Sequence, residues 1–208
     1  MPSITPSATS PKLTQQKFKT TYRVIANDMQ QGAAMARFAT EALKAKRIAV
    51  IDDRTAYGQG LADALVDNLK RLGVTPVGRE FTSDKATDFL AILTRIKAKA
   101  PDVIVYSGMD AQGGPMLKQI KQLGINAKFI TGDGGCTGEI IKLAGDAIGP
   151  NAYCTQPGLP LDKMPSDDRT YTTPALGGFS VGEPPPTEVA QEQPPPQESR
   201  TRTGRAVI

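Results

Sequence analysis

The chain contains no histidine and no tryptophan, only two cysteines, and no long uncharged apolar run. Without histidine it lacks the commonest metal ligand and general base, so zinc hydrolase and Ser-His-Asp schemes lose their key residue. No run approaches the roughly 18 apolar residues of a membrane helix, and Met1–Ile4 does not begin a secretion signal. We therefore expect a non-enzymatic chain without metal or cofactor, which neither spans a membrane nor exports itself.

Length and charge limit the number of domains and the kinds of partner that we expect. A chain of 208 residues can form one sizeable domain or two small ones. Its 25 Lys plus Arg and 21 Asp plus Glu are scattered, and the net charge of +4 does not indicate a nucleic-acid partner. From Pro165 to Ile208 the chain is rich in proline and poor in bulky apolar residues. We predict a disordered Pro-rich tail there and a folded part that ends near Met164.

Before that tail, short β-branched runs alternate with segments of helical periodicity. The predicted strands are 47–51, 76–81, 102–106, 128–131 and 151–154. The first predicted helix follows Tyr57-Gly58, buries Leu61 to Leu72 on one face and ends at Gly73. Another carries Phe89 to Ile96, a third begins near Pro115 and ends at Gly124, and a fourth carries Ile140 to Leu143 and ends at Gly145. A helix upstream of these begins at Asp28 as a cap. This alternation predicts an α/β fold, a doubly wound parallel sheet with helices on both faces. Ligands of such sheets bind beyond the carboxyl ends of the strands.

Two motifs at the carboxyl ends of the predicted strands resemble a response-regulator receiver and a dinucleotide-binding enzyme, but neither motif is complete. Asp52 and Asp53 resemble the acidic pair of a response-regulator receiver, yet the later strands lack its phosphorylated aspartate and its lysine. We interpret the pair as helix-capping and solvated carboxylates. The segment beginning Tyr57-Gly58 lacks the third glycine of a dinucleotide fingerprint because Asp63 occupies that position. Tyr57 is then either a packed aromatic residue or a ligand contact.

Three further features are open to two interpretations each. Asp133, between glycines at 132 and 134, could accept hydrogen bonds from a ligand ammonium or could bond its own backbone in a turn. The hydroxyls and amides of Ser7–Pro11 could hold a carboxylate or form a local turn. Cys136 and Cys154 could form a disulfide or remain two buried thiols, since spacing alone cannot decide.

Several of these segments together resemble a known family. The segments are Thr5–Thr14, Tyr22–Val24, Asp28 with Gln31-Gly32, Asp52-Asp53 with Tyr57–Gly60, Tyr106–Pro115, Gly132–Gly134 and Leu143–Ala147. In order and spacing, over roughly residues 1–164, they are similar to the branched-chain amino-acid (Leu/Ile/Val)-binding proteins of bacterial ABC importers, which have the type I periplasmic binding fold.

The resemblance implies a function and a set of site residues. Members bind an amino acid between two α/β lobes and present the closed form to a membrane permease, so we expect a periplasmic monomer whose partners are a small-molecule amino acid and an ABC permease. By this likeness Ser7 and Thr9 hold the ligand carboxylate, Tyr57 forms a wall, and Asp133, where well-known members have Glu, receives the ammonium group. Met109 and Asp110 lie in a loop where some members carry aromatic residues near the ligand, and the resemblance assigns them no contact.

The resemblance also implies which parts are here. We predict that residues 1–30 are a remnant of the first lobe and crossover, that 31–164 form the ligand-binding lobe, and that 165–208 form the tail, which resembles no part of the family. The family's export signal and most of its first lobe would then be missing, so we expect weak or lost binding. The alternative function is an amino-acid or amide-sensing regulatory or receptor module of the same fold; a flavodoxin-like or nucleotide-using enzyme is a third hypothesis.

Overall fold

The computed structural model describes residues 1–158. The strands of this part are β1 (Ser3–Thr5), β2 (Thr21–Arg23), β3 (Ile48–Asp52), β4 (Gly78–Phe81), β5 (Val103–Ser107), β6 (Lys128–Thr131) and β7 (Ala152–Cys154). Its α-helices are α1 (Lys12–Gln15), α2 (Asp28–Arg37), α3 (Ala56–Arg71), α4 (Leu90–Ala98), α5 (Asp110–Gln122) and α6 (Gly138–Ala144). A π-helical turn, Phe38–Ala42, extends α2, and 3-10 turns lie at Asp133–Gly135 and Gly145–Ala147. No helix in this part of the chain has the length and hydropathy needed to cross a membrane.

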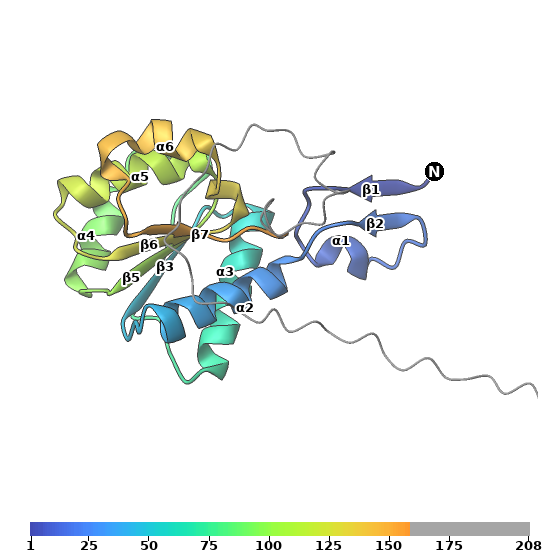
Figure 1. Ribbon diagram of the computed structural model, residues 1–208, viewed down its shortest axis with the longest axis horizontal. Coiled ribbons are helices and arrows are strands. Elements are labelled where there is room, and N and C mark those ends of the chain that lie inside the picture. Colours follow the sequence, from blue (N-terminus) through green and yellow to red (C-terminus); the bar gives the residue numbers. More distant parts are fainter. Residues whose placement is uncertain (159–208) are drawn as a thin grey trace, which may run out of the picture.

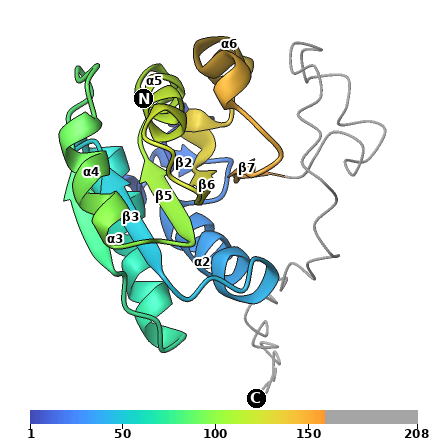
Figure 2. The same cartoon turned by 90° about the vertical axis from the view of Figure 1, so that its left-hand side faces the viewer.

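Five parallel strands form the main sheet in the order β4-β3-β5-β6-β7. In Figures 1 and 2, α5 and α6 lie on one side of this sheet and α2 on the other. The doubly wound α/β fold with helices on both faces is thereby confirmed, and each of the five predicted strands overlaps an observed one. Because every strand runs the same way, all carboxyl ends meet at one edge.

Each face of the sheet has its own apolar core. On one face, α2 and α3 bury residues such as Met35, Leu61 and Leu65 against Val50 and Val105 of the sheet. On the other face α4, α5 and α6 pack against alternate strand residues, which include Ile51, Ile104 and Tyr106. Strands β3 and β5 are buried throughout because both of their faces are covered.

Three local expectations were wrong. Asn27, not Asp28, caps α2, and its side chain accepts hydrogen bonds from the amides of Met29 and Gln30. Pro115 lies inside α5 rather than in its first turn, because the helix already begins at Asp110. Leu72, predicted on the buried face of α3, is 43% exposed because α3 ends at Arg71. The predicted stops at Gly73, Gly124 and Gly145 each have positive φ.

The first strands form a separate small sheet, which lies apart from the main sheet in Figure 1. Strands β1 and β2 pair in parallel, and sequence periodicity predicted neither. The Arg23 guanidinium fixes the connecting segment by donating to the carbonyl oxygen of Ser10 (2.7 Å) and to the Thr14 hydroxyl (2.7 Å). The predicted boundary between residues 30 and 31 falls inside α2, and the predicted tail, 165–208, lies outside the described residues.

Candidate functional site

The site begins where the strands end. The register aligns Asp52 with Ser107 and Thr131 with Cys154, so these strand ends lie along one edge of the sheet. After Thr131 the chain makes a 3-10 turn that starts at Asp133. This turn carries a half-buried carboxylate to the edge at which open α/β sheets bind ligands.

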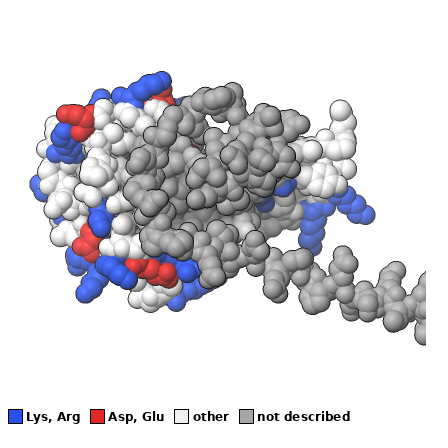
Figure 3. Space-filling model, viewed as in Figure 1, with Lys and Arg blue, Asp and Glu red and all other residues white. Residues whose placement is uncertain are grey.

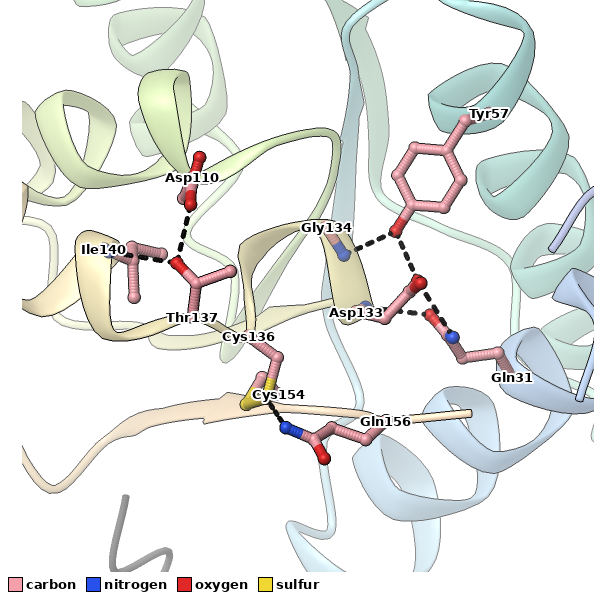
Figure 4. The surroundings of a disulfide bond; sticks show 10 residues. All are labelled: Gln31, Tyr57, Asp110, Asp133, Gly134, Cys136, Thr137, Ile140, Cys154 and Gln156. Atoms are coloured by element: carbon pink, nitrogen blue, oxygen red, sulfur yellow. Dashed lines mark hydrogen bonds between the residues drawn. A yellow bond between two sulfur atoms is a disulfide. The ribbon is translucent and has the colours of Figure 1, made fainter. Parts of the chain in front are cut away.

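Two side chains, one from α2 and one from α3, orient the Asp133 carboxylate, as Figure 4 shows. The Tyr57 hydroxyl of α3 donates to Asp133 Oδ1 at 2.7 Å, and the Gln31 amide of α2 donates to the same oxygen at 3.0 Å. The Gln31 carbonyl oxygen accepts from the Asp133 backbone amide at 3.2 Å. Within residues 1–158 the carboxylate makes no hydrogen bond to its own main chain, so it is not a self-bonded turn aspartate.

Tyr57 binds this turn at two points. Its hydroxyl oxygen accepts from the Gly134 backbone amide at 3.0 Å while its proton goes to Asp133. Burial raises the pKa of the Tyr57 hydroxyl well above its usual range, and the neighbouring Asp133 charge adds to this rise. The phenol therefore stays protonated and remains a donor. Tyr57 is more than a packed aromatic residue, although its contact with a ligand stays a prediction.

The glycines around Asp133 have a packing role. A Cβ atom at Gly132 would lie 2.7 Å from the Tyr57 hydroxyl and 2.7 Å from Gln31 Oε1. A Cβ atom at Gly134 would lie 2.8 Å from Met109 Sδ and 3.0 Å from Tyr57 Cε1. Real Cβ atoms do not approach so closely. Glycine at both positions therefore lets the turn pack directly on the side chains that orient Asp133.

The two predicted carboxylate-holding residues lie in different environments. Thr9 is buried, and its carbonyl oxygen accepts from the Asp28 amide at 3.0 Å, which links its segment to the start of α2. Ser7 is exposed, and its amide donates to the Thr5 hydroxyl at 3.4 Å. The structure brings Tyr57 and Asp133 together, and it joins Thr9 to Asp28 at the start of α2. Within the described residues it gives Ser7 no contact with the other three.

Asp52 and Asp53 have structural partners, and the expectation that they are capping, solvated residues was wrong. Both are buried. Arg79 Nη2 lies 3.1 Å from Asp52 Oδ2, and the Thr55 hydroxyl donates to Asp53 Oδ1 at 2.6 Å. The cap of α3 is Thr55. Strands β3 and β5 are covered on both faces, so their ends are too deeply buried for free solvation.

Cys136 and Cys154 form a disulfide, which resolves the alternative left open by their spacing. The bond joins the segment after Asp133 to β7 (Figure 4). Nearby, the Thr137 hydroxyl caps α6 and donates to Asp110 Oδ2 at 2.6 Å. Asp110 therefore has a structural partner, and the Asp133 turn is tied down on its C-terminal side.

Sequence reasoning missed that Gln31 orients Asp133 and that Asp28, on the same helix, is fully buried. In the sequence Gln31 is only one residue of a motif, and Asp28 is expected to cap a helix. The two residues are three apart on α2, so they share a helix face. That spacing, combined with a buried α2, is the signal that could have placed them together. The contact of Gln31 with Asp133 could not be predicted, because the two residues are 102 positions apart in the sequence.

The charged side chains visible in Figure 3 on the described part of the five-stranded lobe form no large patch of one sign. On the face in Figure 3, Lys and Arg side chains are interspersed with Asp and Glu side chains over the five-stranded lobe. Among residues 1–158, no three His, Cys, Asp or Glu side chains are grouped to hold a metal ion. The Asp133 cluster offers oriented hydrogen-bond acceptors, which suits binding a cationic group.

Comparison with known proteins gives a consistent result. Residues 1–191 match the family described as periplasmic binding protein. The chain is 37% identical over 143 residues to an amino acid binding protein of Pseudomonas aeruginosa and 36% identical over 145 residues to Leu/Ile/Val-binding protein homolog 1 of Brucella abortus. These matches cover 69% and 70% of this chain. The names are those of binding proteins, in agreement with the expectation that the chain is not an enzyme.

Solved structures of binding proteins also resemble this chain. The leucine binding protein LivK from Thermotoga maritima superposes with a TM-score of 0.68 at 34% identity, over 71% of this chain and 42% of that one. The substrate binding protein LivJ from Streptococcus pneumoniae, solved in complex with isoleucine, gives 0.66 at 29% identity, over 74% and 43%.

The extent of these matches is also informative. The chain spans 38% and 39% of the length of the two curated relatives. The family match continues to residue 191, well past Pro165. The expectation that nothing after Pro165 resembles the family was therefore wrong as far as residue 191.

Proposed function

Because this chain belongs to the periplasmic binding protein family, we propose that it binds a branched-chain or similar aliphatic amino acid as the substrate-binding component of an ABC importer. The proposal extends to its partners and location: a permease in the membrane and a place in the periplasm. The Cys136–Cys154 disulfide supports this location because such bonds persist in oxidising compartments.

The observation that carries the proposal is the orientation of the Asp133 carboxylate. Its Oδ1 atom accepts from Tyr57 of α3 and from Gln31 of α2, the two helices that pack together on one face of the sheet. Within the described residues Oδ2 has no such partner, so it is free to accept a hydrogen bond from a ligand ammonium. A zwitterion loses water at both charged ends when it binds, and each end then needs a fixed partner.

The relatives favour the same ligand class. One curated relative is named a Leu/Ile/Val-binding protein, and one solved neighbour holds isoleucine. In this proposal Asp133 receives the ammonium group, Thr9 and Ser7 serve the carboxylate, and Tyr57 contacts the ligand body. None of these groups carries out chemistry on the ligand.

Calorimetric titration of this chain with leucine, isoleucine and valine, up to millimolar concentrations, tests the proposal. We expect weak but saturable binding, which Asp133→Asn weakens further by roughly tenfold or more, because the variant loses the charge opposite the ammonium. Asp146→Asn is the matched control, since it removes the same charge from an aspartate whose side chain is 90% exposed. Equal affinity in wild type and Asp133→Asn, or no binding of any of the three amino acids, would contradict the proposal.

A further inference from the structure

Asp28 is a buried carboxylate that the fold leaves without a partner. It is the first residue of α2, and none of its surface is exposed. Neither of its carboxylate oxygens makes a hydrogen bond within residues 1–158, and no Lys or Arg of that part forms an ion pair with it. The Thr9 hydroxyl lies near the carboxyl group without making a hydrogen bond to it. An unpaired buried charge of this kind is costly.

The described part of the chain has two other buried acids, Asp52 and Asp53, and both have partners. Asp52 is as deeply buried as Asp28, but Arg79 pairs with it and the Arg54 amide donates to it at 3.1 Å. Arg23, the cation that acts on Asp28, has its guanidinium engaged with the carbonyl of Ser10. The Thr55 hydroxyl and amide donate to Asp53 Oδ1 at 2.6 Å and 3.0 Å, so Asp52 and Asp53 each have a polar partner, whereas Asp28 has none within residues 1–158.

The surroundings of Asp28 belong to the Asp133 cluster. Gln31, one turn along α2, donates to Asp133, so the helix face that carries Asp28 is turned toward the Asp133 turn. Asp133 and Asp28 are close enough for their charges to interact, and Tyr57 also senses the charge of Asp28. Gly60 of α3 lies against Asp28, since a Cβ atom there would be 3.8 Å from Asp28 Oδ2. Two carboxylates from distant parts of the sequence therefore lie within electrostatic range of one another.

The electrostatics agree with the geometry. Burial raises the pKa of the Asp28 carboxyl above its ordinary value, and the Asp133 charge adds to the rise. The Thr9 hydroxyl and Arg23 act in the opposite direction. A cation bound between the two acids would relieve both the burial penalty and the repulsion.

We propose that Asp28 is a second acidic ligand-binding residue, which together with Asp133 binds the ammonium group of the ligand. The inference rests on the proposed function and deepens it, because it defines the ligand class by its amine. An unsubstituted ammonium has three N–H donors. One N–H bonds Asp28, one bonds Asp133 Oδ2, and one is left for the Thr9 segment. The site therefore selects primary amines and rejects N-acylated or deaminated analogues of the same size.

The test uses 3-methylbutylammonium, which keeps the amine and the side chain of leucine but has no carboxylate. Its affinity for the full chain is measured by NMR titration for wild type, Asp28→Asn, Asp133→Asn and the surface control Asp146→Asn. We expect each of the first two variants to weaken binding roughly tenfold or more, and the control to match wild type. Wild-type affinity in Asp28→Asn, or no binding of the amine to wild type, overturns the proposal.

A parallel titration with leucine separates this proposal from the proposed function. If the amine binds and needs both acids while leucine does not bind, the amino-acid function fails and the role of Asp28 stands. If leucine binds wild type and Asp28→Asn equally, the role of Asp28 fails and the function stands.

A measurement on the unmodified chain guards against a misfolded variant. The 13C resonance of the Asp28 carboxyl should shift as 3-methylbutylammonium is added, in step with that of Asp133. An Asp28 resonance that stays fixed while that of Asp133 moves overturns the proposal.

Discussion

The contact between α2 and α3 at Gly32 gives the most direct test of the fold beneath the site. A Cβ atom at Gly32 would lie 2.8 Å from the Leu65 amide nitrogen and 2.9 Å from the Ala64 Cβ and carbonyl carbon. Comfortable separations are about 3.5–4.0 Å, so Gly32→Ala forces the two helices apart. Gly60, also within a helix at this interface, has only the ordinary 3.8 Å contact with Asp28. The same substitution at Gly60 is therefore a matched control.

The two variants should change stability by different amounts. Replacing a helical glycine by alanine stabilises a helix by about 1 kcal/mol, and this gain applies at both positions. Overpacking costs about 1–3 kcal/mol, and this cost applies only at Gly32, where rigid backbone lies in the way. Gly60→Ala should therefore be more stable than Gly32→Ala by about 1–3 kcal/mol. For a chain of this size that is a difference in melting temperature of about 2–12 °C.

Thermal unfolding followed by far-UV circular dichroism, with urea denaturation for the free energy, measures the difference. Gly32→Ala should also weaken leucine binding, because α2 carries Gln31 and Asp28. If Gly32→Ala melts at or above Gly60→Ala, the packing argument is wrong.

Three further results are expected. Replacing Cys136 and Cys154 by serine should lower the free energy of unfolding by about 3 kcal/mol, as expected for a link across 18 positions, and a melting temperature insensitive to reductant would contradict this. Tyr57→Phe should cost about 1 kcal/mol of stability and weaken leucine binding in calorimetry, because Asp133 loses a donor; unchanged affinity would refute that role. The contribution of Asp28 to stability should be greatest below its ordinary pKa of 3.8 and should be lost as pH rises through its raised folded-state value, so Asp28→Asn should lack this loss in urea titrations between acid and neutral pH.

The main sheet could be predicted from sequence because its strands are continuous apolar runs. Runs such as Ile48–Asp52 and Val103–Ser107 are buried on both faces, and glycines such as Gly73 end the helices between them. The first two strands could not be predicted, because each has three residues and Ile4 and Tyr22 on them are 65% and 53% exposed.

The error in the predicted start of α5 also has a physical cause. The start of α5 was placed too late because Gly113 and Gly114 are poor helix formers. They are tolerated because a Cβ atom at Gly114 would overlap Leu143 of α6, so glycine allows the two helices to pack closely.

The candidate site could be predicted only in part. The sequence alone shows that Asp133 is a carboxylate placed just after a predicted strand. Its hydrogen bonds to Gln31 and Tyr57 join residues 102 and 76 positions apart, which no local pattern contains. A capping aspartate and a buried one look alike in sequence, and only tertiary packing shows that Asp28 is buried and does not cap α2.

The Tyr57 hydroxyl has one proton and two neighbours, a backbone N–H and a carboxylate. Since the Gly134 amide occupies an oxygen lone pair, the phenol proton can satisfy only Asp133. The orientation of the Tyr57 O–H bond is thus fixed before a ligand binds, and binding requires no rearrangement of Tyr57 and Asp133. Such preorganisation lowers the entropic penalty of association.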